Sequence, residues 1–308
     1  MGVYIGKRML LGLLTMLGAT IVAFILGILS PSDPAMVALS LDGNSVPTAM
    51  ELEEKRRSLG LDAPYTVQYV RWVYGVMLGD WGTSYITGDP IFPKLWAASK
   101  VTMTLTLLGL LNIIVGGLLG GTILRATQNR FRKKVVFFLT VLGSSVPSFW
   151  LAIILMHILS EQWRIFPTNG YDSLWHLVLP AFVLSVSGTS LLMRIHATGV
   201  ERVQKEGYFL TARAKGLPHW YILYKHVLRN ASLSSLTVIG NYIVGMIGGA
   251  IIVEVIFSLP GLGSLMLEGI RARDYPIVQG YVLLVGAMTA FINISIDICY
   301  TWLQPKIR

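Results

Sequence analysis

Six long apolar stretches divide this chain into alternating hydrophobic and polar segments. Each runs for about 18 residues or more without Asp, Glu, Lys or Arg. A helix of about 20 residues, rising about 1.5 Å per residue, crosses a hydrocarbon core of about 30 Å. The pattern therefore predicts an all-α integral membrane protein with six transmembrane helices. The predicted spans are Met9–Leu29, Val101–Leu124, Val135–Ser160, Ser173–Met193, Ala231–Val253 and Ile277–Ile296.

The first stretch could be mistaken for a secretory signal peptide, because Lys7 and Arg8 precede it. Signal peptides have an apolar region of about 7–15 residues followed by a cleavage site of small residues. Here the uncharged run is longer, and no clear site of that kind follows. We therefore expect residues 1–30 to form a retained N-terminal helix.

Composition supports the membrane assignment and excludes several other classes of protein. Hydrophobic residues make up 54% of the 308 residues and charged residues 13%, about half the charged share of a soluble protein. This excludes a disordered tail protein and a conventional cytosolic enzyme. The chain has one cysteine, Cys299, so an intrachain disulfide framework is excluded as well.

The basic residues predict the orientation in the membrane. With a cytoplasmic N-terminus, the inside segments hold 16 of the 25 Lys and Arg but only two of the 16 acidic residues. Cytoplasmic loops next to spans carry this excess of Lys and Arg. Both termini are therefore expected inside. The same distribution accounts for the net charge of +9 without a nucleic-acid partner.

Residues 31–100 are too polar to span the membrane and are expected outside. Thr48 followed by Glu51 fits a capping box, and Gly60 stands where a helix would stop, which predicts a short helix over 49–59.

A second, amphipathic helix is expected between Pro64 and Gly79. Its apolar positions are Val67, Val70, Tyr74 and Met77. The aromatic residues that suit a membrane interface are Trp72, Tyr74 and Trp81. The external segment could be a lid packed on the outer helix ends or a docking surface for an external partner.

Two of the predicted spans are rich in glycine. The residues concerned are Gly116, Gly117, Gly120 and Gly121 in the second span, and Gly240, Gly245, Gly248 and Gly249 in the fifth. Small residues let helix backbones approach closely in lipid. Tight helix packing is the simpler interpretation of these glycines. An interface that rearranges during transport is also compatible with them, so Gly248 and Gly249 are candidates for the translocation pathway or its gating.

The polar loop between the fourth and fifth spans carries the most specific signal. Residues 208–216 favour a short helix, and Gly216 and Pro218 would end it sharply. From the residues alone, this is either a surface helix presented to a cytosolic partner or a solvated loop.

That loop, with the pattern Y-x-x-T-A-R-A-K-G from Tyr208 to Gly216, resembles the permease subunits of ABC importers, in the peptide/nickel family (the oligopeptide/dipeptide permease B type). The acidic residue that begins the general form of this motif is absent here. Further segments similar to the family occur along nearly the whole chain: Asp33-Pro34, Leu59-Gly60-Leu61-Asp62, Gly79-Asp80-Trp81-Gly82, Pro147-Ser148-Phe149-Trp150, Leu179-Pro180, Ile252-Val253-Glu254, Phe257-Ser258-Leu259-Pro260-Gly261 and Arg273-Asp274-Tyr275-Pro276.

The resemblance implies a type I ABC importer permease fold with three segments. These are an N-terminal transmembrane helix (1–30), an extracytoplasmic helical segment (31–100) and a five-helix core (101–308) with a cytoplasmic coupling loop (194–230). The implied ATPase-coupling residues are Tyr208, Thr211, Ala212, Arg213, Ala214, Lys215 and Gly216.

The same resemblance implies partners and a place in the cell. The chain would pair with a homologous second permease in the bacterial inner membrane, dock two cytosolic ATPases and receive substrate from an extracytoplasmic binding protein. The sequence lacks the phosphate-binding pattern G-x-x-x-x-G-K-[ST], so ATP and Mg are expected on the partner ATPases and no cofactor on this chain.

Further candidates for the translocation pathway are three residues near the ends of predicted spans, whose side chains are polar or could bind a metal. Glu254 follows an uncharged run, and a carboxylate at membrane depth is a functional hypothesis by default, although pairing with Arg271 or Arg273 is the simpler interpretation. His157 and Met156 could contact a chelated metal, but no spacing typical of a resident metal site is present.

Other classes of function are less well supported. An ion-gradient transporter would need ionisable residues near the middle of its spans, and none is found there. An intramembrane hydrolase would need a nucleophile with a base or a metal. Within the resembled family the substrate stays open between di- or oligopeptides and nickel or a metallophore, with a slight preference for peptides.

Overall fold

The computed structural model describes residues 2–28, 33–40, 47–127, 129–216, 218–222 and 229–303. Within these ranges all regular secondary structure is helical, apart from a single isolated β-bridge between Thr83 and Pro90. The elements in chain order are α1 (Gly2–Ile28), α2 (Pro34–Ser40), α3 (Ala49–Ser58), α4 (Tyr65–Met77), α5 (Ile91–Ala126), α6 (Arg130–Ser145), α7 (Ser148–Leu155), the π-helix η1 (Met156–Gln162), α8 (Trp175–Gln204), α9 (Gly207–Ala214), α10 (His219–Ile222), α11 (Arg229–Ile256), α12 (Leu262–Ala272) and α13 (Tyr275–Leu303).

The all-helical membrane fold predicted from the sequence is confirmed. Four helices, α5, α8, α11 and α13, are long and apolar enough to cross a membrane. The first predicted span corresponds to α1, in which the apolar helix Met9–Ile25 is slightly shorter than the length needed to count it with them. The total of six spans therefore remains a prediction.

The third predicted span is not one straight helix. Its residues form α6 and then α7 with η1, and the two parts meet at an angle of 107°. The break follows from Val146 and Pro147, which have extended backbone conformations, so that Pro147 caps α7 instead of continuing α6. Counted as one broken span, this pair raises the number of candidate spans to five.

The two short helices predicted over 49–59 and between Pro64 and Gly79 are present as α3 and α4. At the start of α3, the Thr48 side chain accepts a hydrogen bond from the Glu51 backbone amide. The Glu51 carboxylate accepts one from the Thr48 backbone amide, which completes the capping box. Gly60 follows the helix with a φ of 68°, in the left-handed region. The helix α4 begins after Pro64 and ends before Gly79.

The chain divides into two compact units, each with its own packing. Unit 1 consists of residues 1–101 and 260–308, and unit 2 of residues 102–259. The division cuts α5 between Val101 and Thr102. The three segments predicted from the sequence are not tested by this grouping and stay a prediction.

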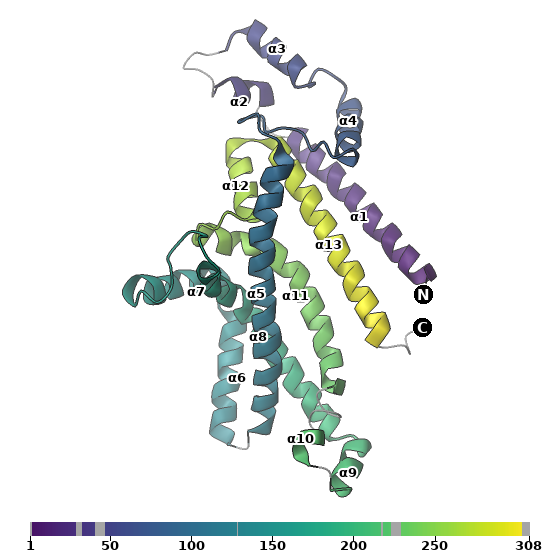
Figure 1. Ribbon diagram of the computed structural model, residues 1–308, viewed down its shortest axis with the longest axis vertical. Helices are drawn as coiled ribbons and strands as arrows, with labels where there is room; N and C mark the ends of the chain where they lie inside the picture. Colours follow the sequence, from purple (N-terminus) through teal and green to yellow (C-terminus); the bar gives the residue numbers. More distant parts are fainter. Residues whose placement is uncertain are drawn as a thin grey trace. The chain divides into compact units, whose positions relative to one another are not determined.

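Unit 1 is organised by α1 and α13, which pack along each other (Figure 1). Its buried apolar cluster joins the first turns of α5 to α12 and α13. The buried members are Ile91, Leu95, Ala98, Leu262, Ile277 and Tyr281, and Trp81 packs against them. The α3–α4 segment is attached to this unit through contacts between α4 and α1.

Unit 2 is organised by α8, in which twelve residues are buried. It packs against α6, α7 and α11. Ile113 of α5, Leu192 of α8 and Met246 of α11 form the centre of its apolar core. The chain continues from α8 into the loop that carries α9 and α10.

Candidate functional site

The segment expected to couple the spans to an ATPase contains the short helix that the sequence predicted. It is α9, which includes residues 207–214. Phe209 of α9 is buried together with Val200 and Val203 of α8 and Ile222 of α10. An aromatic side chain therefore anchors α9 to the end of α8.

The opposite face of α9 and the turn after it are open to solvent. Thr211, Ala214, Lys215 and Gly216 are exposed, and Gly216 has a φ of 72°. Only glycine adopts this conformation without strain, which explains the sharp stop. The same helix includes Tyr208, Ala212 and Arg213, but their side chains are outside the described part of the structure.

The glycines of α5 serve helix packing. A Cβ at Gly117 would lie 2.6 Å from the Leu192 side chain, and one at Gly121 would lie 2.7 Å from the Met193 carbonyl oxygen. Gly116 and Gly120 face Thr189 and Met193 of α8 in the same way. The packing interpretation made from the sequence is therefore correct for this group.

The glycines of α11 behave differently. A Cβ at Gly245, Gly248 or Gly249 would meet nothing within 4 Å, and all three positions are exposed. They leave a small-residue face of α11 uncovered by the chain's own described residues. The role of Gly248 and Gly249 in a pathway or gate stays a prediction.

Glu254 is fully buried near the end of α11. The Thr102 hydroxyl of α5 donates to its Oε1 at 2.6 Å, which supplies one of the hydrogen bonds that a buried carboxylate needs. The expected pairing with Arg271 or Arg273 stays a prediction, as does a pathway role.

Met156 and His157 begin the π-helix η1. The His157 ring contacts Glu161 Oε2 through Nδ1 at 2.7 Å and Gln162 Nε2 through Nε2 at 3.1 Å. Both imidazole nitrogens thus have partners on the same helix. No group of three or more His, Cys, Asp or Glu side chains suited to a metal ion occurs in the described residues.

Sequence reasoning did not single out His196 of α8, which the structure places at a junction of three helices. Its ring is fully buried. Nε2 lies 3.2 Å from Thr122 Oγ1 of α5, and Nδ1 lies 3.1 Å from Ser235 Oγ of α11. The only signal in the sequence is three isolated polar residues on three apolar helices, with nothing to show that they meet.

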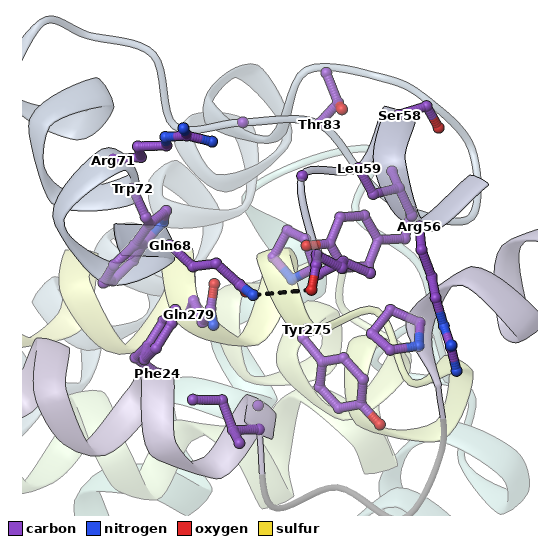
Figure 2. Close-up of a pocket in the computed structure, with 18 of the residues that line it drawn as sticks. Phe24, Arg56, Ser58, Leu59, Gln68, Arg71, Trp72, Thr83, Tyr275 and Gln279 are labelled. Atoms are coloured by element: carbon purple, nitrogen blue, oxygen red, sulfur yellow. Dashed lines mark hydrogen bonds between the residues drawn. The ribbon is translucent and has the colours of Figure 1, made fainter. Parts of the chain in front are cut away.

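Unit 1 contains a cavity of about 950 Å³ where α1 ends and α13 begins (Figure 2). One end is formed by the aromatic rings of Phe24 and Trp72 with the amides of Gln68 and Gln279, and Arg56 lies on another wall. The Gln68 amide donates to the Leu61 and Ala63 carbonyl oxygens. Gln68 therefore fixes the connection between α3 and α4 as one wall of the cavity.

The loop between α4 and α5 forms part of the same cavity and is fixed by a buried carboxylate. Asp274, at the start of α13, accepts hydrogen bonds from Ser84 Oγ and the Tyr85 amide. Ser84 Oγ also accepts from the amides of Ile86 and Thr87, at 3.2 and 3.0 Å. One hydroxyl thus orders the loop and ties it to α13. Burial, and secondly the Asp274 carboxylate, raise the pKa of Tyr85.

Both halves of the chain match family models of one kind of transport protein. Residues 112–308 match the binding-protein-dependent transport system inner membrane component, and residues 1–106 match the N-terminal part of the corresponding membrane component.

Two curated relatives and one solved structure extend this match. A probable peptide ABC transporter permease of Sinorhizobium fredii is 35% identical over the full length of both chains. The glutathione transport system permease of Salmonella paratyphi A is 34% identical over 99% of this chain and 98% of its own. The fold is similar to a chain of the inward-facing MetNI methionine ABC transporter, with a TM-score of 0.56 and 14% identity over 69% of this chain and 98% of the other.

Members of this family are the non-enzymatic membrane subunits of complexes in which ATPase partners hydrolyse ATP. The chain therefore belongs to the binding-protein-dependent transport system inner membrane component family and is a multi-pass permease subunit of an ABC importer.

Proposed function

We propose that this chain forms half of the translocation pathway of an importer for di- or oligopeptides in the bacterial inner membrane. It pairs with a homologous second permease, and both termini face the cytoplasm, where two ATPases bind ATP and Mg. An extracytoplasmic binding protein delivers the substrate. The observation that carries the peptide assignment is the full-length similarity to permeases named for peptides and for glutathione. It favours peptides over the nickel or metallophore alternative.

The coupling step is proposed at α9. Its exposed face and the turn at Gly216 seat in a groove of one ATPase, and Phe209 connects this contact to α8. Closure of the ATPase dimer then shifts an equilibrium between inward- and outward-facing states of the membrane helices. The packing of Phe209 with Val200 and Val203 supports this proposal, because it joins the exposed helix to a span.

Substrate is tested by uptake in a strain that lacks the gene for this chain. The experiment compares a labelled dipeptide with labelled nickel, each with and without the restored gene. We expect restored dipeptide uptake and no change in nickel uptake. Restoration of nickel uptake alone would show that the peptide assignment is wrong.

Coupling is tested with Gly216→Val, which places a β-branched residue at a left-handed backbone position. Gly207→Ala in the same segment is the matched control, because a Cβ there meets nothing within 4 Å. In proteoliposomes containing the whole importer, Gly216→Val should lower the amount of peptide transported per ATP hydrolysed. Unchanged transport per ATP, with normal assembly, would contradict the coupling role.

A further inference from the structure

The two helices of the external segment differ sharply in polarity. Of the ten residues of α3, six are charged, and none of its residues is buried. The thirteen residues of α4 include one charged residue, Arg71. A helix that is polar all round belongs in water, whereas an amphipathic helix needs an apolar surface to cover one face. The two helices therefore have different surroundings.

The apolar face of α4 is not covered by the described part of this chain. Val70, Tyr74 and Met77 are 63%, 64% and 79% exposed, and Val67 at the edge of the same stripe is 38% exposed. These positions repeat at helical spacing and form one uncharged stripe. The opposite face carries Tyr69, which packs on α1.

The contacts of α4 with α1 give its depth relative to the membrane. Tyr69 Oη lies 2.9 Å from Thr20 Oγ1, and the ring centroids of Phe24 and Trp72 are 6.4 Å apart. Thr20 precedes the last residue of α1, Ile28, by eight residues, which corresponds to about 12 Å along the helix axis. Thr20 and Phe24 also lie within the apolar helix Met9–Ile25. The Tyr69 and Trp72 side chains of α4 therefore contact α1 within its apolar part, Met9–Ile25.

Arg71 occupies the position expected for a helix at the boundary between lipid and water. It follows Val67 by four residues, so it lies about 40° around the helix from Val67, at the edge of the stripe. Its side chain is exposed and lines the cavity of unit 1. A long cationic side chain at such an edge keeps its charge in the polar region while its methylene groups cover apolar surface.

We propose that α4 is an interfacial helix whose stripe of Val67, Val70, Tyr74 and Met77 contacts lipid acyl chains. It lies in the leaflet at the Ile28 end of α1, which is the outer leaflet in the proposed orientation. Amphipathic helices of this kind bury their apolar face about 5–10 Å into the boundary between headgroups and acyl chains. The depth set by Thr20 and Tyr69 favours lipid over a water-soluble protein partner. The polar helix α3 is then the part of the segment left in water.

The proposal is tested by fluorescence quenching in the assembled importer. Cys299 is the only cysteine, so Cys299→Ser provides the background for single-cysteine variants at Val70 and Met77, each labelled with bimane. Leu13 and Leu14 of α1, both more than half exposed, provide membrane references. Glu54 of α3, an exposed charged residue, provides the aqueous reference.

Phosphatidylcholine brominated near the headgroup should quench the labels at Val70 and Met77 at least half as strongly as those on α1. Aqueous iodide should quench them several-fold less than the label at Glu54. Iodide quenching equal to that at Glu54 would overturn the proposal.

Shielding from iodide that occurs only after the binding protein is added would also overturn the proposal, because it would show a protein partner on the stripe. Shielding without lipid quenching would do the same and point to the second permease. Met77 is the most exposed position of the stripe, so labelling there keeps the test valid if the Val70 variant fails to fold. The readout does not depend on the transported substrate.

Discussion

The Nε2 atom of His196 donates a hydrogen bond to Thr122 Oγ1 at 3.2 Å. This direction follows because the Thr122 hydroxyl donates its own proton to the Leu118 carbonyl oxygen at 2.8 Å. In the neutral ring Nδ1 is then an acceptor, facing Ser235 Oγ at 3.1 Å. A single imidazole therefore connects α5, α8 and α11 through groups with defined donor and acceptor roles. One of these three helices, α8, leads along the chain to α9.

Replacement of this imidazole should weaken the packing of the three helices. His196→Leu removes both hydrogen bonds in a fully buried position, and we expect a loss of about 1–3 kcal/mol in stability. His196→Gln places an amide near the position of Nε2 and should recover part of that loss. Thermal unfolding of the purified complex measures both effects. A melting temperature for His196→Leu equal to that of the wild type would contradict the proposed role of the junction.

The loop held by Asp274 should open when its hydroxyl partner is removed. Ser84→Ala deletes the donor to Asp274 and the acceptor for two loop amides, so faster hydrogen exchange is expected in residues 82–90. Asp89→Asn is the matched control in the same loop, because the exposed Asp89 carboxylate interacts at the surface, with Lys94 at 2.7 Å and with Thr87, and not with Asp274. Equal exchange in the two variants would show that the buried bond does not fix the loop.

Alkaline pH should destabilise the same loop through Tyr85. Burial and the nearby Asp274 carboxylate raise the pKa of Tyr85 in the folded state, above the unfolded value of about 10. Its contribution to stability is thus complete below about pH 10 and is lost as the pH rises through the folded pKa. Melting temperatures measured between about pH 8 and 11 should fall less steeply for Tyr85→Phe than for the wild type. Parallel curves would mean that another group causes the alkaline loss.

Two sets of glycines should respond oppositely to an added methyl group. Gly121→Ala would place a Cβ 2.7 Å from the Met193 carbonyl oxygen, and the required backbone shift should cost about 1–3 kcal/mol. Gly249→Ala meets nothing within 4 Å and should leave the folding of the chain unchanged. Melting temperatures and peptide uptake are measured for both variants. Lost uptake with normal stability in Gly249→Ala would support its pathway or gating role, whereas equal destabilisation of both would contradict the packing difference.

Local features of the sequence predicted the helices well because their causes are local. The capping box of α3 depends on Thr48 and Glu51, three residues apart. Gly216 ends the segment that contains α9, because its backbone is left-handed. In both cases the residues that decide the structure lie within one helical turn of the element that they terminate.

Proline shows where local reasoning fails. Both Pro147 and Pro180 lie within predicted spans. Pro147 breaks its span with a bend of 107°, whereas α8 continues through Pro180, which is buried against neighbouring helices. The missing amide proton is the same in both. Packing around the residue decides whether the helix bends, and a single sequence does not contain that packing.

The sequence by itself determined that this chain crosses a membrane as helices and which family it resembles, because crossing the hydrocarbon core requires long apolar runs that can be read directly. Only the tertiary structure decided which polar groups meet. His196 is hydrogen-bonded to Thr122, which is 74 residues away in the sequence, and Asp274 is hydrogen-bonded to Ser84, which is 190 residues away. Such contacts depend on how helices are rotated and displaced against one another, and the local periodicity of one helix carries no information about its partner.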